Sequence, residues 1–220
     1  MINYVALLGA SYEEGKDIYT LEELAERFGL EKLNKAPAIF DYKKLEWYNG
    51  QYIRMKSDKE LADLTLPFAV EAGIFGNTGK KPQPDEVEKF VAAMPLVRER
   101  AVFLKEIPDK IRYLFSEPPV PAAEDFIPKK AGRAQAINLL KIGRELVSAL
   151  STSDDTKAEE LVKGAAEKEN VKLGDLLMPL RAAITGTRVS PPLFGSLRLL
   201  GAEKCLIRID KALAVLEAGD

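Results

Sequence analysis

Histidine is absent from the 220-residue sequence, and cysteine occurs once, at Cys205. Without an imidazole the chain cannot hold a Ser-His-Asp triad, a histidine general base or a His-ligated zinc ion. The lone cysteine lies in the apolar helical pattern "AEKCLIRIDKAL", which indicates a buried core residue and a reducing compartment. We therefore expect no catalytic residue and no metal site in this chain.

Long apolar runs are also missing. No segment approaches the about 20 apolar residues that a membrane span needs, and "MINYVALLGASYEEG" lacks the basic start and apolar stretch of a signal peptide. The segment "GNTGKK" at 76–81 lacks the flanking strand and helix of a phosphate-binding loop. These absences predict a cytoplasmic protein with no membrane partner, and they disfavour an autonomous enzyme.

Charge is present in quantity but unevenly distributed. The net charge is −2, made of +3 over residues 129–220 and −5 over residues 1–128. This mild C-terminal excess of basic residues favours a local phosphate contact over a general polyanion binder, so no DNA binding is expected. A solvated surface of mixed charge fits almost as well.

Apolar periodicity predicts an all-α protein, since strand alternation is nearly absent. Capping boxes begin at Thr20 and Ser57, each with a glutamate three residues later, and Asp41 is suited to cap a third helix. A long amphipathic helix is predicted over residues 84–107, with a kink at Pro95.

The composition changes at residues 116–132, which contain four prolines and few periodic apolar residues. This pattern is typical of an extended linker or a domain boundary, and we expect a flexible joint there. Five helix-sized segments with short connections follow it. The chain is therefore predicted to form helical bundles in series.

Residues 174–197, "GDLLMPLRAAITGTRVSPPLFGSL", combine two apolar helices with a polar corner. Gly186 and the pair Pro191–Pro192 are expected to fix this corner, and Ser190 to cap a helix that starts at Pro191. Arg181 is suited to stack on a base or to form a forked hydrogen bond. Such a corner fits the reading of splayed-out RNA bases, but an ordinary helix–helix turn is an equal alternative from the pattern alone.

Three long segments, at 2–54, 94–115 and 172–213, resemble consecutive parts of bacterial glutamyl-tRNA synthetases. They begin "INYVALLGASYEEG", "MPLVRERAVFLKEI" and "KLGDLLMPLRAAIT", and they keep the order of the family over almost the whole chain. The resemblance implies a stem-contact region at residues 1–62, a first anticodon-binding helical domain at 63–128 and a second at 129–220. It also implies a monomer whose partner is the tRNA for glutamate.

Two signatures of that family's catalytic half are missing. The histidine-containing signature cannot occur in this sequence, and the Lys-Met-Ser-Lys-type loop is expected to lie before residue 1. The chain therefore resembles the C-terminal part of the enzyme. The resemblance implies a full-length class I synthetase that attaches glutamate to its tRNA with ATP and magnesium, while this part is inactive and needs no cofactor.

The resemblance also implies which residues read the anticodon. Four residues of the corner are expected to contact its first two bases: Arg181, Ser190, Pro191 and Leu193. Arg100 is expected to read the third base. Arg188 and Arg98 are candidate phosphate contacts. For both Arg98 and Arg100 the alternative is ion pairing with Glu99, Glu106 or other neighbours on a solvated face, which contributes little energy.

The role implied for Arg100 has a simple chemical basis. Cytosine presents two acceptors on its pairing edge, whereas guanine presents N–H donors, and a guanidinium group has only donors. Glutamate anticodons end in C and glutamine anticodons in G, so Arg100 suggests an enzyme that charges only glutamate tRNA. The alternative function is a helical protein-interaction module without RNA binding, supported by the acidic net charge and by the lack of a wide basic stripe.

Overall fold

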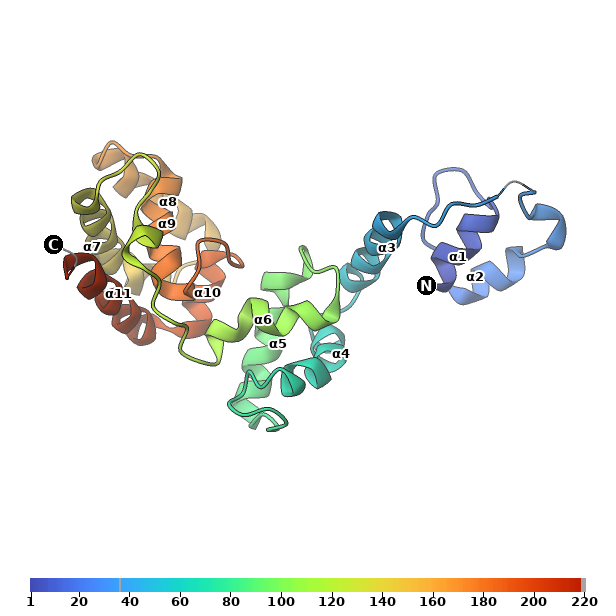
Figure 1. Cartoon of the computed structure of the whole chain (residues 1–220), viewed down its shortest axis with the longest axis horizontal. Coiled ribbons are helices and arrows are strands. Elements are labelled where there is room, and N and C mark those ends of the chain that lie inside the picture. Colours follow the sequence, from blue (N-terminus) through green and yellow to red (C-terminus); the bar gives the residue numbers. More distant parts are fainter. Residues whose placement is uncertain (36, 219–220) are drawn as a thin grey trace.

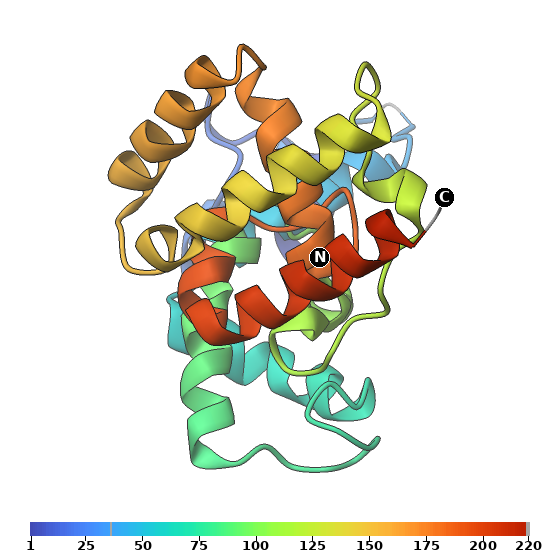
Figure 2. The same ribbon diagram turned by 90° about the vertical axis from the view of Figure 1, so that its left-hand side faces the viewer.

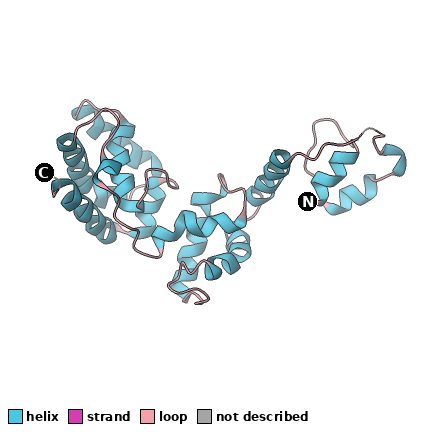
Figure 3. Ribbon diagram, in the orientation of Figure 1, coloured by secondary structure: helices cyan, strands magenta, loops and turns pink. Residues whose placement is uncertain are grey.

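The computed structural model describes residues 1–35 and 37–218, so Ala36 and the last two residues of the predicted domain 129–220 lie outside it. The described residues form eleven α-helices and four short 3-10 helices, with one isolated antiparallel bridge between Ala10 and Leu33 and no strand. Figure 3 shows this helical content along the whole ribbon. The prediction of an all-α fold is confirmed.

The N-terminal part contains α1 (Ile2–Gly9), α2 (Leu21–Arg27), the 3-10 turn η1 (Leu30–Lys32) and α3 (Tyr42–Arg54). The Thr20 hydroxyl accepts from the Glu23 N–H at 3.1 Å, and the Glu23 carboxylate accepts from the Thr20 N–H at 2.9 Å. Asp41 caps α3 by accepting from the Lys43 N–H at 2.8 Å. Both predicted N-caps are therefore formed, because each needs only neighbouring residues.

The middle part contains α4 (Asp58–Glu71), α5 (Pro84–Arg98), η2 (Leu104–Glu106), α6 (Ile107–Ile111) and η3 (Arg112–Leu114). The prediction of one helix over 84–107 is wrong, because α5 includes Pro95 but ends at Arg98. The chain then turns tightly, with the Arg100 N–H donating to the Val97 carbonyl at 3.1 Å, and it buries Ala101 completely. Arg100 therefore lies in a turn and not on a helix face.

The C-terminal part begins with η4 (Ala123–Phe126) and continues with α7 (Arg133–Leu150), α8 (Asp155–Lys168), α9 (Leu173–Thr185), α10 (Leu193–Leu200) and α11 (Ala202–Glu217). The five helices predicted after the proline-rich segment are thus present. Figure 2 shows α7 and α11 packed across the front of this bundle. Cys205 is fully buried in α11, and burial raises the pKa of its thiol to about 11, as fits a core residue.

The parts follow one another in space, with α1 and α2 at one end, α4–α6 in the middle and α7–α11 at the other end (Figure 1). One continuous hydrophobic core nevertheless extends from Ile53 to Leu216, and α5 packs directly against α10. The division predicted after residue 62 falls inside α4. The middle and C-terminal bundles therefore form a joint scaffold on which residues from both can meet.

The segment 116–132 is mostly extended, as predicted, but it is held along its length. The Phe126 side chain is fully buried in the shared core. Glu117 forms ion pairs with Arg208 at 3.1 Å and Lys211 at 2.8 Å. These contacts bind the segment to α11 and to the core, and they argue against the flexible joint expected from the sequence.

Candidate functional site

A cleft of about 720 Å³ lies where the middle bundle meets the corner between α9 and α10. The middle bundle contributes residues from α5 to η3, including Arg100 and Tyr113, and the corner contributes Thr187, Val189, Ser190 and Pro191. Pro118 and Pro119 of the extended segment complete its wall. The structure thus brings together Arg100, Ser190 and Pro191, three of the residues to which the sequence assigns a role in RNA reading.

Arg181 holds the corner from the last turns of α9. Its Nη1 donates to the Ser190 hydroxyl at 2.7 Å, to the Pro191 carbonyl at 2.8 Å and to the Ser190 carbonyl at 3.3 Å. Burial lowers the pKa of Arg181; the nearby Tyr113 opposes this effect and the positive charge of Arg100 adds to it. Arg181 is therefore half-buried behind the cleft, and one of its nitrogens already fixes the backbone that the cleft presents.

The predicted capping role of Ser190 is wrong. Helix α10 begins at Leu193, its N-cap is Pro192, and no side chain caps it. The Ser190 hydroxyl instead accepts from Arg181 and donates to the Pro191 carbonyl at 3.1 Å. A cationic donor attracts a hydroxyl acceptor more strongly than a neutral backbone N–H does, so Ser190 serves the corner rather than the helix end.

Two further contacts fix the start of the corner. Gly186 has φ 76°, and a Cβ atom at this position would come within 2.8 Å of the Pro118 Cβ atom. Any other residue would therefore meet both an unfavourable backbone conformation and a clash. Thr187 donates from its hydroxyl to the Val189 carbonyl at 2.8 Å, which tightens the loop.

Arg188 connects the corner to η4. Its guanidinium group donates to the carbonyls of Asp125 at 3.1 Å, Ile127 at 3.4 Å and Glu124, and it forms an ion pair with the Asp125 carboxylate at 3.4 Å. These partners occupy the Nε and Nη2 donors of the guanidinium group. The contacts favour a structural role for Arg188 over the phosphate contact expected from the sequence.

Arg98 and Leu193 are also turned away from the cleft. The Arg98 guanidinium pairs with Asp58 at the start of α4, so the ion-pair alternative describes its environment. Leu193 is 4% exposed and lies in the shared core. Because neither side chain lines the cleft, we leave both out of the proposed contact set.

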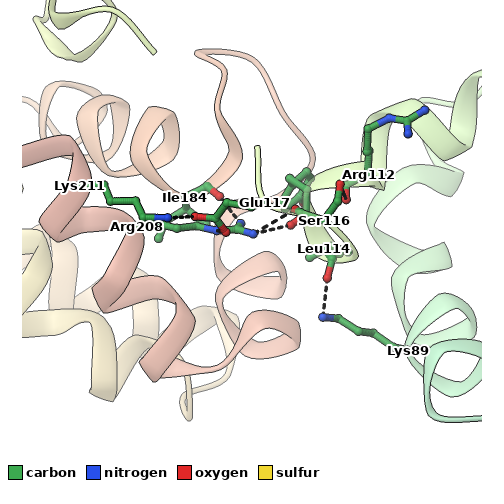
Figure 4. A network of polar contacts seen from close by, with 9 residues as sticks. Lys89, Arg112, Leu114, Ser116, Glu117, Ile184, Arg208 and Lys211 are labelled. Carbon is green, nitrogen blue, oxygen red and sulfur yellow. Dashed lines mark hydrogen bonds and ion pairs between the residues drawn. The ribbon is translucent and has the colours of Figure 1, made fainter. Parts of the chain in front are cut away.

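The junction beside the cleft is closed by a polar network around Arg208 (Figure 4). Arg208 is 5% exposed and donates to the carbonyls of Ile184 at 2.6 Å, Tyr113 at 2.9 Å and Ser116 at 3.3 Å. Its Nε donates to the Glu117 carboxylate at 3.1 Å. One side chain of α11 therefore joins α9, η3 and the extended segment.

Two other features of this junction concern titratable groups. The Tyr113 and Ser196 hydroxyls are 2.6 Å apart in a buried contact between η3 and α10, and burial raises the pKa of Tyr113. Burial opposes ionisation of Glu117, but hydrogen bonds from Lys211 and Arg208 and the charge of Arg208 lower its pKa overall. Glu117 is therefore an ionised, paired carboxylate at ordinary pH.

The other charged side chains that line the cleft are paired, whereas Arg100 is not paired with any residue that the structure describes. Glu106 pairs with Lys110 at 3.2 Å, Asp109 pairs with Arg112 at 2.7 Å, and Glu117 pairs with Arg208 and Lys211. Arg100 is exposed, and its side chain forms no hydrogen bond or ion pair with any residue that the structure describes. All its guanidinium donors therefore face the cleft or solvent.

The sequence interpretation missed two residues of this region. Arg208 lies three residues after Cys205 and one before Ile209, on the apolar face of α11, and a charged residue on such a face is a signal for a buried anchor. Val189 lines the cleft with its side chain 85% exposed. An exposed apolar side chain in a polar loop is a weaker signal for a contact with a flat ligand.

Two negative findings apply to the described residues. No three histidine, cysteine, aspartate or glutamate side chains in residues 1–35 and 37–218 are grouped so that they could hold a metal ion. Within the same ranges, no helix combines the length and the apolar character needed to cross a bilayer.

Comparison with known proteins places this all-α chain among the anticodon-binding proteins. The chain belongs to the family described as Anticodon binding domain, which matches residues 60–213. It is 44% identical to the glutamate–tRNA ligase of Treponema denticola over 97% of this chain and 46% of that protein. Identity to the ligase of Treponema pallidum is 41%, over 96% of this chain and 42% of the relative.

A solved structure gives the same result. The glutamate tRNA ligase of Elizabethkingia meningosepticum, crystallised in complex with its amino acid, is similar with a TM-score of 0.71 and 26% identity, over 98% of this chain and 40% of that one. The resemblance to glutamyl-tRNA synthetases is therefore confirmed, and the chain spans just under half the length of the relatives it matches.

Proposed function

We propose that this chain recognises the anticodon of the tRNA for glutamate, as part of a glutamate–tRNA ligase. The observation that carries the proposal is the unpaired Arg100 guanidinium in a cleft shared with the Ser190–Pro191 corner. Single-stranded bases are read by donors and backbone groups fixed in this way. Membership of the anticodon-binding family supports the same conclusion.

The proposed contacts differ between the two sides of the cleft. Arg100 supplies donors for the third anticodon base. Ser190, Pro191 and Val189 offer backbone and apolar surface to the first two bases, while Arg181 holds that surface in place. We retain the three-part division into a stem-contact region and two anticodon-binding domains as part of this proposal.

The whole protein is proposed to attach glutamate to its tRNA in the cytoplasm, as a monomer, with ATP and magnesium bound outside these residues. A test against the alternative of a protein-interaction module is titration of a glutamate tRNA transcript at several salt concentrations. Binding through phosphates must weaken steeply as salt rises. Absence of binding at low salt would favour the interaction module.

We expect the purified chain to give no glutamate-dependent exchange of pyrophosphate into ATP. The sequence contains no histidine, which the nucleotide-binding signature of the family requires, and no phosphate-binding loop. The measurement is an exchange assay with glutamate and the tRNA present. Exchange above the level of a no-enzyme control would contradict the assignment of the chemistry to other residues of the protein.

Replacing Arg181 by alanine is expected to weaken binding of glutamate tRNA by about 0.5–2 kcal/mol, the range for residues that act on a site without touching its ligand. The substitution removes the donor that fixes the Ser190 and Pro191 carbonyls. Affinity and the thermal midpoint are measured together. Arg144→Ala is the control, because that exposed arginine pairs with Asp210 on another side of the bundle; equal affinities for the two variants would remove Arg181 from the site.

A further inference from the structure

The position of the Arg100 guanidinium group depends on the backbone of the turn that carries it. This turn follows the end of α5 and precedes η2, and the Arg100 side chain has no partner among the described residues. A guanidinium group that selects between two bases needs a position fixed to about 0.5 Å. Other elements must therefore hold the backbone on both sides of Arg100.

Helix α3 supplies these contacts. Arg54 Nη1 donates to the Glu99 carbonyl at 3.3 Å, and Asn49 Nδ2 donates to the Val102 carbonyl. Glu99 directly precedes Arg100, and Val102 follows it by two residues. The turn is thus held on both flanks by side chains that are five residues apart on α3.

The backbones of α3 and of the Arg100 turn lie close together, which allows Asn49 and Arg54 to reach the carbonyls of the turn. Gly50 follows Asn49 on α3 and is buried. A Cβ atom at this position would come within 3.3 Å of Arg54 Nη1 and 3.6 Å of the Ala101 carbonyl. Ala101 itself is fully buried. The Arg100 turn therefore lies directly on α3.

The same helix is attached to the N-terminal part. The Tyr48 hydroxyl donates to Asp17 at 3.2 Å, and the Tyr52 hydroxyl donates to the Tyr19 carbonyl at 3.2 Å. These tyrosines alternate along α3 with the residues that hold the turn. A displacement of α3 would consequently move the backbone of Arg100 and the contacts of the N-terminal part together.

We propose that Asn49 and Arg54 are positioning residues for Arg100, which set the selectivity for the third anticodon base without touching that base. This inference rests on the proposed function of Arg100. Both side chains act through the carbonyls of the turn, so their loss leaves the guanidinium group present but free to shift. Selectivity falls as a result, because a displaced guanidinium group interacts with cytosine and with guanine at more similar affinities.

The test uses the whole chain and two glutamate tRNA transcripts, with C or G as the third anticodon base, at one fixed salt concentration. We expect Asn49→Ala and Arg54→Met each to lower the C-over-G affinity ratio by about threefold, a size typical of residues that act without touching the ligand. Arg54→Lys keeps a cationic donor and is expected to retain most of the ratio. Arg27→Met, which removes an exposed arginine paired with Glu13, is the matched control.

Thermal midpoints and Arg100→Gln separate the outcomes. A lower ratio in folded Asn49→Ala and Arg54→Met, with an unchanged ratio in Arg27→Met, supports the proposal. Equal losses of affinity for both transcripts, or a lower midpoint with the ratio unchanged, overturn it and indicate a structural role. If Arg100→Gln alone lowers the ratio, the positioning role is wrong and the role proposed for Arg100 stands. If Arg100→Gln does not lower it either, the role proposed for Arg100 is wrong as well.

Discussion

Replacing Arg208 by methionine is expected to lower the free energy of unfolding by about 3 kcal/mol, since unsatisfied buried polar groups cost about 1–3 kcal/mol each and partly relax. Methionine matches the aliphatic length but donates no hydrogen bond. The carbonyls of Ile184, Tyr113 and Ser116 would lose their bonds to this side chain. Unfolding in denaturant, followed by circular dichroism, measures the change.

The matched control for this substitution is Arg144→Met. Arg144 forms a two-pronged contact with Asp210, at 2.6 and 3.2 Å, but it is exposed. An exposed pair of this kind contributes roughly 0–1 kcal/mol. If the free energy of unfolding falls equally in the two variants, the Arg208 network does not stabilise the junction more than an exposed ion pair does.

Local signals allowed much of the fold to be predicted. Thr20, Asp41 and Ser57 cap their helices as expected, because each cap depends on residues at most three positions away. Gly186 ends α9 in the left-handed conformation for the same reason. These features depend on residues close in the sequence, so they could be predicted without knowledge of the tertiary packing.

Predictions failed where distant residues decide the structure. Helix α5 ends at Arg98, and Ala101 beyond it is fully buried beside Gly50 of α3, an arrangement that the local apolar pattern does not show. Ser190 lost its capping role to Arg181, nine residues earlier on α9. Local propensity is thus overridden where a strong cationic donor or a buried contact competes with it.

The candidate site was predictable in part. The resemblance singled out Arg100, Ser190 and Pro191, which the structure brings together on one cleft, and their roles remain to be tested. It did not indicate that Arg188 is bonded to carbonyls more than 60 residues away. A sequence identifies which cations are present, whereas only the folded chain shows which of them are already paired.

Replacing Arg100 by glutamine is expected to lower the C-over-G affinity ratio by about tenfold, within the about 1–3 kcal/mol that a two-pronged base contact contributes to discrimination. Arginine presents only donors, so it matches the acceptors of cytosine and opposes the N–H groups of guanine. Glutamine can donate or accept, which removes the mismatch with guanine and weakens the match with cytosine. Because the side chain has no partner among the described residues, its replacement should leave the fold unchanged.

The measurement is a two-by-two comparison of the unaltered chain and Arg100→Gln, each with transcripts that carry C or G as the third anticodon base, at one salt concentration. Arg112→Gln is the control within the same cleft, since Arg112 is bonded to Asp109 and to the Ala72 carbonyl. That variant removes a charge of the same kind, so it is expected to weaken both complexes alike and keep the ratio. An unchanged C-over-G ratio in Arg100→Gln would mean that Arg100 does not read the third base. Discrimination would then arise from the corner held by Arg181 or from residues elsewhere in the ligase.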